Sequence, residues 1–108
     1  MNEQATPQGT LGTAEIERLK KQHGRIYEVV VDDEGTRYAA YFRRPHMTTL
    51  AAMTKMAKTD EMAAARVMLE NCWVSGAEAV RTDAALFVAV VGQFGTVIGS
   101  VRAEIKNV

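Results

Sequence analysis

Residues 26–45, IYEVVVDDEGTRYAAYFRRP, decide the fold of this chain. β-Branched and aromatic residues fill the start of the stretch and aromatic residues return towards its end, which is typical of two strands. The residues between, Asp32-Asp33-Glu34-Gly35, have turn chemistry, and Gly35 is expected to adopt a positive φ because it lacks a Cβ. The second strand should end before Pro45, which has no N–H to donate. The stretch therefore predicts a β-hairpin.

Helical patterns flank the hairpin, each with a capping residue at its start. Before the hairpin, Thr13 is expected to cap a short helix that stops at Gly24. The helices expected after the hairpin start at Thr48 or Thr49, at Thr59 or Asp60, and at Thr82 or Asp83. The middle one should run through Trp73, with a break at Gly76. The predicted fold class is α+β, a short N-terminal helix and a β-hairpin followed by three to four helices.

The final helical stretch has the strongest apolar periodicity in the chain. Its apolar residues repeat close to the helical period and are Phe87, Val90, Val91, Phe94, Ile98, Val101 and Ile105. Gly92, Gly95 and Gly99 interrupt this pattern, each at a cost of about 1 kcal/mol relative to Ala in a helix interior. Two interpretations stay open: the helix breaks near Gly95, or the glycines let another backbone approach closely.

Length and composition predict one ordinary globular unit. A chain of 108 residues with 47% hydrophobic and 24% charged residues fits a single domain, expected over residues 13–108. Residues 1–12 are polar with almost nothing apolar, so we expect them to form a disordered tail.

Charge and cysteine content bear on the class of partner and on the compartment. Thirteen Lys and Arg balance thirteen Asp and Glu, so general nucleic-acid binding is disfavoured and a homo-oligomer is mildly favoured. A single cysteine, Cys72, suits a reducing compartment. The longest apolar stretch, Ala84–Val91, is far shorter than the roughly 20 residues that cross a bilayer. We expect a soluble cytoplasmic protein.

The residues with reactive side chains do not gather in the sequence. Cys72 falls on the apolar side of a predicted helix, which favours a buried structural thiol over a nucleophile. His23 and His46 have no neighbouring ligand at metal-binding spacing. The acids of the hairpin turn lack the alternating spacing of a calcium loop. We expect no catalytic site, no metal site and no cofactor, so a non-enzymatic protein.

Aromatic and methionine side chains are the candidates for contact with a partner. Three arginines, Arg37, Arg43 and Arg44, are interleaved with aromatic residues on the second strand. That strand can supply a core face, a protein interface, or a surface for single-stranded nucleic acid. Methionines on the following helices can fill the core or form an adaptable binding surface. The partner-binding candidates are Tyr38, Tyr41, Phe42, Met53, Met56 and Trp73.

Four short sequence motifs resemble those of a known family. They are Phe42-Arg43-Arg44-Pro45 after the hairpin, Met68–Gly76 (MLENCWVSG), Thr82–Phe87 (TDAALF), and Ala103-Glu104-Ile105. Together they make the chain resemble small phage and prophage tail assembly chaperones over about residues 20 to 107. The chain departs from that pattern at Val74-Ser75-Gly76, where a second glycine would be expected, and in the three glycines of its last helix.

The resemblance implies a non-enzymatic protein of phage tail morphogenesis in the bacterial host cytoplasm. Such a protein binds the tape measure protein or tail tube subunits before they polymerise. Two alternatives stay open, a structural virion or adaptor component that is retained in the particle, and a single-stranded nucleic-acid-binding module. The family has no catalytic residues to carry over.

Overall fold

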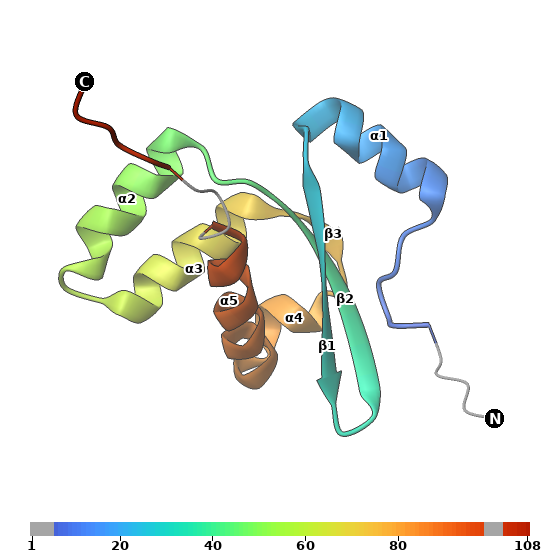
Figure 1. Cartoon of the computed structure of the whole chain (residues 1–108). Helices are drawn as coiled ribbons and strands as arrows, with labels where there is room; N and C mark the ends of the chain where they lie inside the picture. Colours follow the sequence, from blue (N-terminus) through green and yellow to red (C-terminus); the bar gives the residue numbers. More distant parts are fainter. Residues whose placement is uncertain (1–5, 99–102) are drawn as a thin grey trace.

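The computed structural model describes residues 6–98 and 103–108, and within them the chain is an α+β fold, as predicted. Figure 1 shows the element order along the chain. The elements are α1 (Thr13–His23), β1 (Ile26–Asp33), β2 (Thr36–Arg43), α2 (Met47–Ala57), α3 (Glu61–Cys72), β3 (Trp73–Gly76), α4 (Ala79–Thr82) and α5 (Ala84–Ile98).

The hairpin forms where the sequence predicts it. Its strands pair antiparallel with Asp33 opposite Thr36, which leaves a two-residue turn. Both turn residues have positive φ, 50° at Glu34 and 94° at Gly35, the geometry that matches the twist of a hairpin. The Asp32 carboxylate accepts a hydrogen bond of 2.8 Å from the Gly35 N–H. β2 ends at Arg43, two residues before Pro45.

A third strand extends the hairpin, and the sequence pattern did not predict it. β3 pairs antiparallel with β2, so the sheet order is β1-β2-β3. Trp73, expected at a helix end, opens this strand instead. Gly76 has a φ of 133°, and a Cβ there would lie 2.6 Å from the carbonyl oxygen of Ala39 and from the Cα of Ala40. Glycine therefore allows the two backbones to approach closely.

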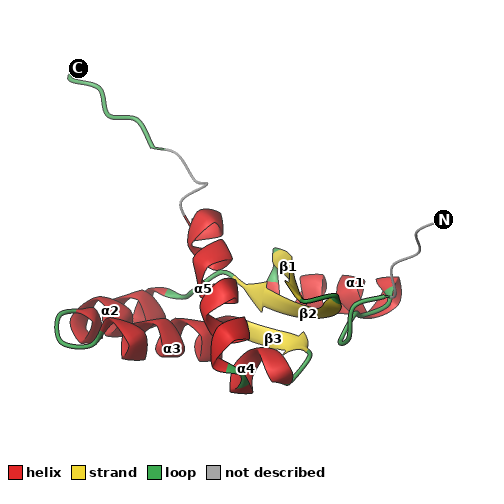
Figure 2. Ribbon diagram, turned by 90° about the horizontal axis from the view of Figure 1, so that it is seen from below, coloured by secondary structure: helices red, strands yellow, loops and turns green. Residues whose placement is uncertain are grey.

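The main core lies between one face of the sheet and the helices. Val29 and Val31 of β1 and Ala40 and Phe42 of β2 point to this face, as the alternation of a strand requires. Figure 1 shows α5 between the sheet and the α2–α3 pair, and Figure 2 shows α2 and α3 extending away from the sheet. The helices contribute the buried residues Met68, Leu69, Cys72, Val80, Leu86, Phe87, Val90 and Phe94.

Chain that precedes the sheet pairs with the edge of β2 and covers part of the opposite face. Residues 8 to 11 differ from the disordered tail expected over 1–12, because they bond to β2. The Gln8 N–H donates to the Arg37 carbonyl over 2.9 Å, and the Gln8 carbonyl accepts from the Ala39 N–H over 2.8 Å. α1 follows and buries Leu19. Backbone groups of β2, rather than apolar side chains, order this segment.

Most helix starts fall within two residues of the expected ones. Asp60 caps α3, since its carboxylate accepts from the Ala63 N–H, and Asp83 accepts from the Leu86 N–H at the start of α5. Two caps were predicted wrongly: Gly12 precedes α1 in place of Thr13, and His46 precedes α2 in place of Thr48 or Thr49. Thr49 is buried inside α2 instead. The single turn α4 was not predicted.

The last helix is continuous from Ala84 to Ile98, so the interpretation of a break near Gly95 is wrong. At Gly92 an added Cβ would meet nothing within 4 Å, so no second backbone approaches there. Gly99 and Val101 lie outside the described residues. Ile105 was expected on the helical stripe, but residues 103–108 have no regular structure and Ile105 is exposed.

Candidate functional site

Two of the six predicted contact residues belong to the interior. Tyr41 and Phe42 are neighbours on β2 and point to opposite faces of the sheet, yet each is only 1% exposed. Both are buried because the sheet is covered on both faces. The prediction that Tyr41 and Phe42 contact a partner is therefore corrected, because neither side chain is exposed at the surface.

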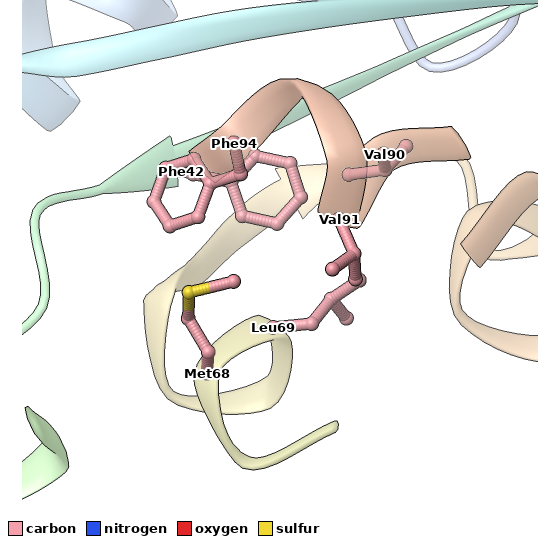
Figure 3. A pocket seen from close by; sticks show the side chains of 6 residues that line it. All are labelled: Phe42, Met68, Leu69, Val90, Val91 and Phe94. Carbon is pink, nitrogen blue, oxygen red and sulfur yellow. The ribbon is translucent and has the colours of Figure 1, made fainter. Parts of the chain in front are cut away.

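Phe42 is the centre of an aromatic cluster. Its ring meets that of Trp73 edge to face, with centroids 5.7 Å apart, and that of Phe94 at 5.2 Å. Figure 3 shows the rings of Phe42 and Phe94 next to each other above Met68, and Val91 next to Leu69. The space enclosed by these side chains leaves no room for a water molecule. The cluster joins the sheet to α3 and α5 and is structural.

Tyr38 and Trp73 are only partly available to a partner. Both are half-buried and pack against the main core. The guanidinium of Arg81 lies 5.0 Å from the centroid of the Trp73 ring, a cation–π contact that covers part of that ring. Arg81 also donates to Glu70 over 2.6 Å, and this hydrogen bond lowers the pKa of the Glu70 carboxyl. These contacts fix α4 against α3.

Four methionines of α2 and α3 are at least partly accessible. Met53 and Met56 of α2 are half-buried, and Met53 packs on the main core. Met47 at the start of α2 is 79% exposed, and Met62 at the start of α3 is 58% exposed. We call Met47, Met53, Met56 and Met62 the methionine surface. Met47 and Met62 were absent from the predicted set, although their clustering with Met53 and Met56 was visible in the sequence.

The strand that carries the arginines does not present a stacking surface. Arg43 donates to the Asn71 carbonyl over 2.5 Å, and Arg44 donates to the Tyr27 hydroxyl over 3.1 Å. The aromatic neighbours Tyr41 and Phe42 are buried, so bases could not stack on them. The arrangement gives no support to a nucleic-acid interface on β2.

Tyr41 holds the segment that covers the second face of the sheet. Its hydroxyl donates to the Glu28 carboxylate over 2.5 Å and accepts from the Leu11 N–H over 3.1 Å. Burial, together with the bond to Glu28, raises the pKa of the Tyr41 hydroxyl. The phenol therefore stays protonated and keeps both bonds at neutral pH.

The potentially reactive groups lie apart from one another. Cys72 is buried at the end of α3, as predicted, and burial raises the pKa of its thiol to about 11. This thiol is protonated at neutral pH and is a poor nucleophile. His23 ends α1 and His46 precedes α2, and both side chains are exposed. Over residues 6–98 and 103–108, no three His, Cys, Asp or Glu side chains gather as they would around a metal ion.

Val88 is an exposed apolar residue that the periodicity did not single out. It is 54% exposed on α5, beside the buried Phe87. Val88 lies one residue away from the apolar stripe in the sequence, and this position was the signal that its side chain could be exposed.

Within the described part of the chain, no helix has both the length and the hydropathy to cross a membrane.

No protein-family model and no curated protein matches this chain. One solved structure is similar, that of an uncharacterised protein from Bacillus stearothermophilus. It has 21% sequence identity and a TM-score of 0.61, over 85% of this chain and 99% of the other. At this identity the likeness concerns the fold, which the two proteins share across nearly the whole of the Bacillus chain.

Proposed function

We propose that this chain is a non-enzymatic, protein-binding factor of the phage tail assembly chaperone type. It binds tape measure or tail tube subunits in the bacterial host cytoplasm and keeps them soluble before they polymerise. The observation that carries the proposal is the methionine surface, in which Met47 and Met62 are exposed and Met53 and Met56 are half-buried on α2 and α3. The choice of client comes from the resemblance of the segments MLENCWVSG and TDAALF to motifs of tail assembly chaperones.

Flexible thioether side chains suit a client that changes shape. Methionine has three rotatable side-chain bonds and a polarizable sulfur, so one surface can adapt to different apolar segments. The surface is also spread over two helices, α2 and α3, which are joined by a short loop. A chaperone needs such an accessible apolar surface and does not need a reactive group.

Co-expression with a phage tape measure protein tests the proposal. The chain should co-purify with it, and Met47→Asp should reduce the recovered complex about tenfold, since an exposed apolar contact is replaced by a charge. The substitution should leave the fold intact because an acid is favourable in the first turn of a helix. Thr48→Asp, an exposed neighbour with the same added charge, is the matched control and should retain binding.

Failure of the wild-type chain to bind either the tape measure protein or tail tube subunits would refute the proposal. Mass spectrometry of purified particles separates the alternative of a retained structural component. A chaperone should be absent from finished particles, and a structural protein should be present in a fixed ratio to the tube subunit.

A further inference from the structure

The first halves of α3 and α5 leave an apolar groove between them. Two adjoining hollows, of about 470 and 110 Å³, share the side chains of Met62, Phe87 and Val88. Ala65 and Val91 line the smaller hollow. We call this feature the α3–α5 groove.

The groove is accessible, and its smaller hollow has a carboxylate at the rim. Met62 is 58% exposed and Val88 is 54% exposed, although both are apolar. Asp60 and Arg66 both line the larger hollow, where the Arg66 guanidinium lies over the Phe87 ring and bonds to Glu70. Glu61 lines the smaller hollow, which has no cation among its lining residues. An apolar segment that carries a positive charge would complement this groove.

Residues 103–108, AEIKNV, have these properties. Ile105 is 98% exposed and Val108 is fully exposed, and both are large apolar side chains. Lys106 lies between them in the sequence. The spacing of three places Ile105 and Val108 on one face if the segment forms a helical turn. The segment has no regular structure in the chain by itself.

We propose that Ile105 and Val108 of one copy of this chain insert into the α3–α5 groove of a second copy, with Lys106 facing Glu61. A second copy is the occupant because Ile105 is almost fully exposed within its own chain. A net charge of zero gives the copies no overall repulsion. Ordering a segment without regular structure costs free energy, so the association is weak, in the micromolar to millimolar range.

The donor segment and the acceptor groove are different patches of the same chain. Two copies can therefore exchange their segments reciprocally in a closed dimer, or pass them in one direction to form rings or open chains. This self-association goes beyond the proposed function, since it concerns another occupant and can be measured without any tail protein.

Sedimentation equilibrium of the full chain over a range of concentrations tests the inference. The wild-type chain should associate, and Val88→Glu should weaken the association about tenfold, because an apolar contact is lost and a charge is placed on the apolar floor of the groove. Ala89→Glu is the matched control: Ala89 is exposed on the same helix outside the groove, and its substitution should change little. Circular dichroism confirms that both variants fold.

Substitutions in the donor segment give a second test. They should not disturb the core, because residues 103–108 are exposed. Ile105→Asp should weaken the association by a similar factor, and Asn107→Asp, which adds the same charge two residues away, should have a smaller effect. Lys106→Glu and Glu61→Lys should each weaken association, and a chain carrying both changes should recover it.

Mixing two variants establishes the direction of the contact. Val88→Glu chains keep a donor segment, and Ile105→Asp chains keep a groove, so their mixture should form heterodimers that do not grow further. The inference is overturned if the wild-type chain is monomeric throughout, if Ile105→Asp and Val88→Glu leave association unchanged, or if the mixture does not associate.

Discussion

On one face of the sheet, Phe42 and Ala40 pack against the helices, whereas on the other face Tyr41 and Ala39 lie under the segment that contains Gln8 and Leu11. The first face is held by apolar contact. On the second side, Gln8 pairs with the edge of β2 as a parallel bridge, and the Tyr41 hydroxyl bonds to Leu11 on the face itself. β2 is therefore enclosed on its two sides by different kinds of interaction. Substitutions on the two sides should have different effects.

The largest effect is expected on the apolar face. Phe42→Ala removes a ring that contacts both Trp73 and Phe94, and the cavity should lower the free energy of unfolding by about 3–5 kcal/mol. Urea unfolding followed by circular dichroism measures the loss. Phe42→Leu retains most of the apolar volume and should lose clearly less. A loss from Phe42→Ala below about 1 kcal/mol would mean that the aromatic cluster does not anchor the core.

A smaller effect is expected where the covering segment approaches the sheet. Gly9 has a φ of 89°, and a Cβ there would lie 2.8 Å from the Ala39 carbonyl oxygen. Gly9→Ala should therefore displace the segment and lower the free energy of unfolding by about 2 kcal/mol. Gly12→Ala, where a Cβ would meet nothing, should change it by less than about 0.5 kcal/mol. Equal losses in the two variants would show that close approach at Gly9 is unimportant.

The smallest effect is expected at the hydroxyl that ties the segment down. Tyr41→Phe keeps the buried ring but removes the bonds to Leu11 and Glu28, so it should cost about 1 kcal/mol. Hydrogen exchange at the Leu11 and Ala39 amides should become faster. Tyr38→Phe, on the same strand but the other face, is the control and should not change exchange at Leu11. Unchanged exchange in Tyr41→Phe would show that the hydroxyl does not hold the segment.

Local chemistry in the sequence was enough for the hairpin and for most helix ends. The turn Asp32–Gly35, the stop before Pro45 and the caps at Asp60 and Asp83 depend on neighbouring residues, so each could be predicted. β3 could not be predicted in this way, because its four residues contain one aromatic side chain and form a strand only by pairing with the edge of β2. The segment around Gln8 was missed for the same reason: its order comes from the backbone of β2.

The candidate site was predicted less well than the fold. Alternation along β2 suggested that its aromatic side chains were shared between a core face and an open face, but α5 and the covering segment bury both Phe42 and Tyr41. Methionine clustering in the sequence singled out α2 and α3 as a candidate region, and the structure shows that Met47 and Met62 are exposed there. Exposure depends on which elements pack together, and the pattern of a single element does not contain that information.

The sequence by itself determined the α+β class, the hairpin with its turn, and a buried, unreactive Cys72, because these depend on local conformational preference and apolar periodicity. Only the tertiary structure decided that the sheet has a third strand and two covered faces, and that Met62 and Val88 remain open beside the α3–α5 groove. The physical reason is that pairing an edge and covering a face are contacts between segments distant in the sequence, whose free energy appears only once the chain has folded.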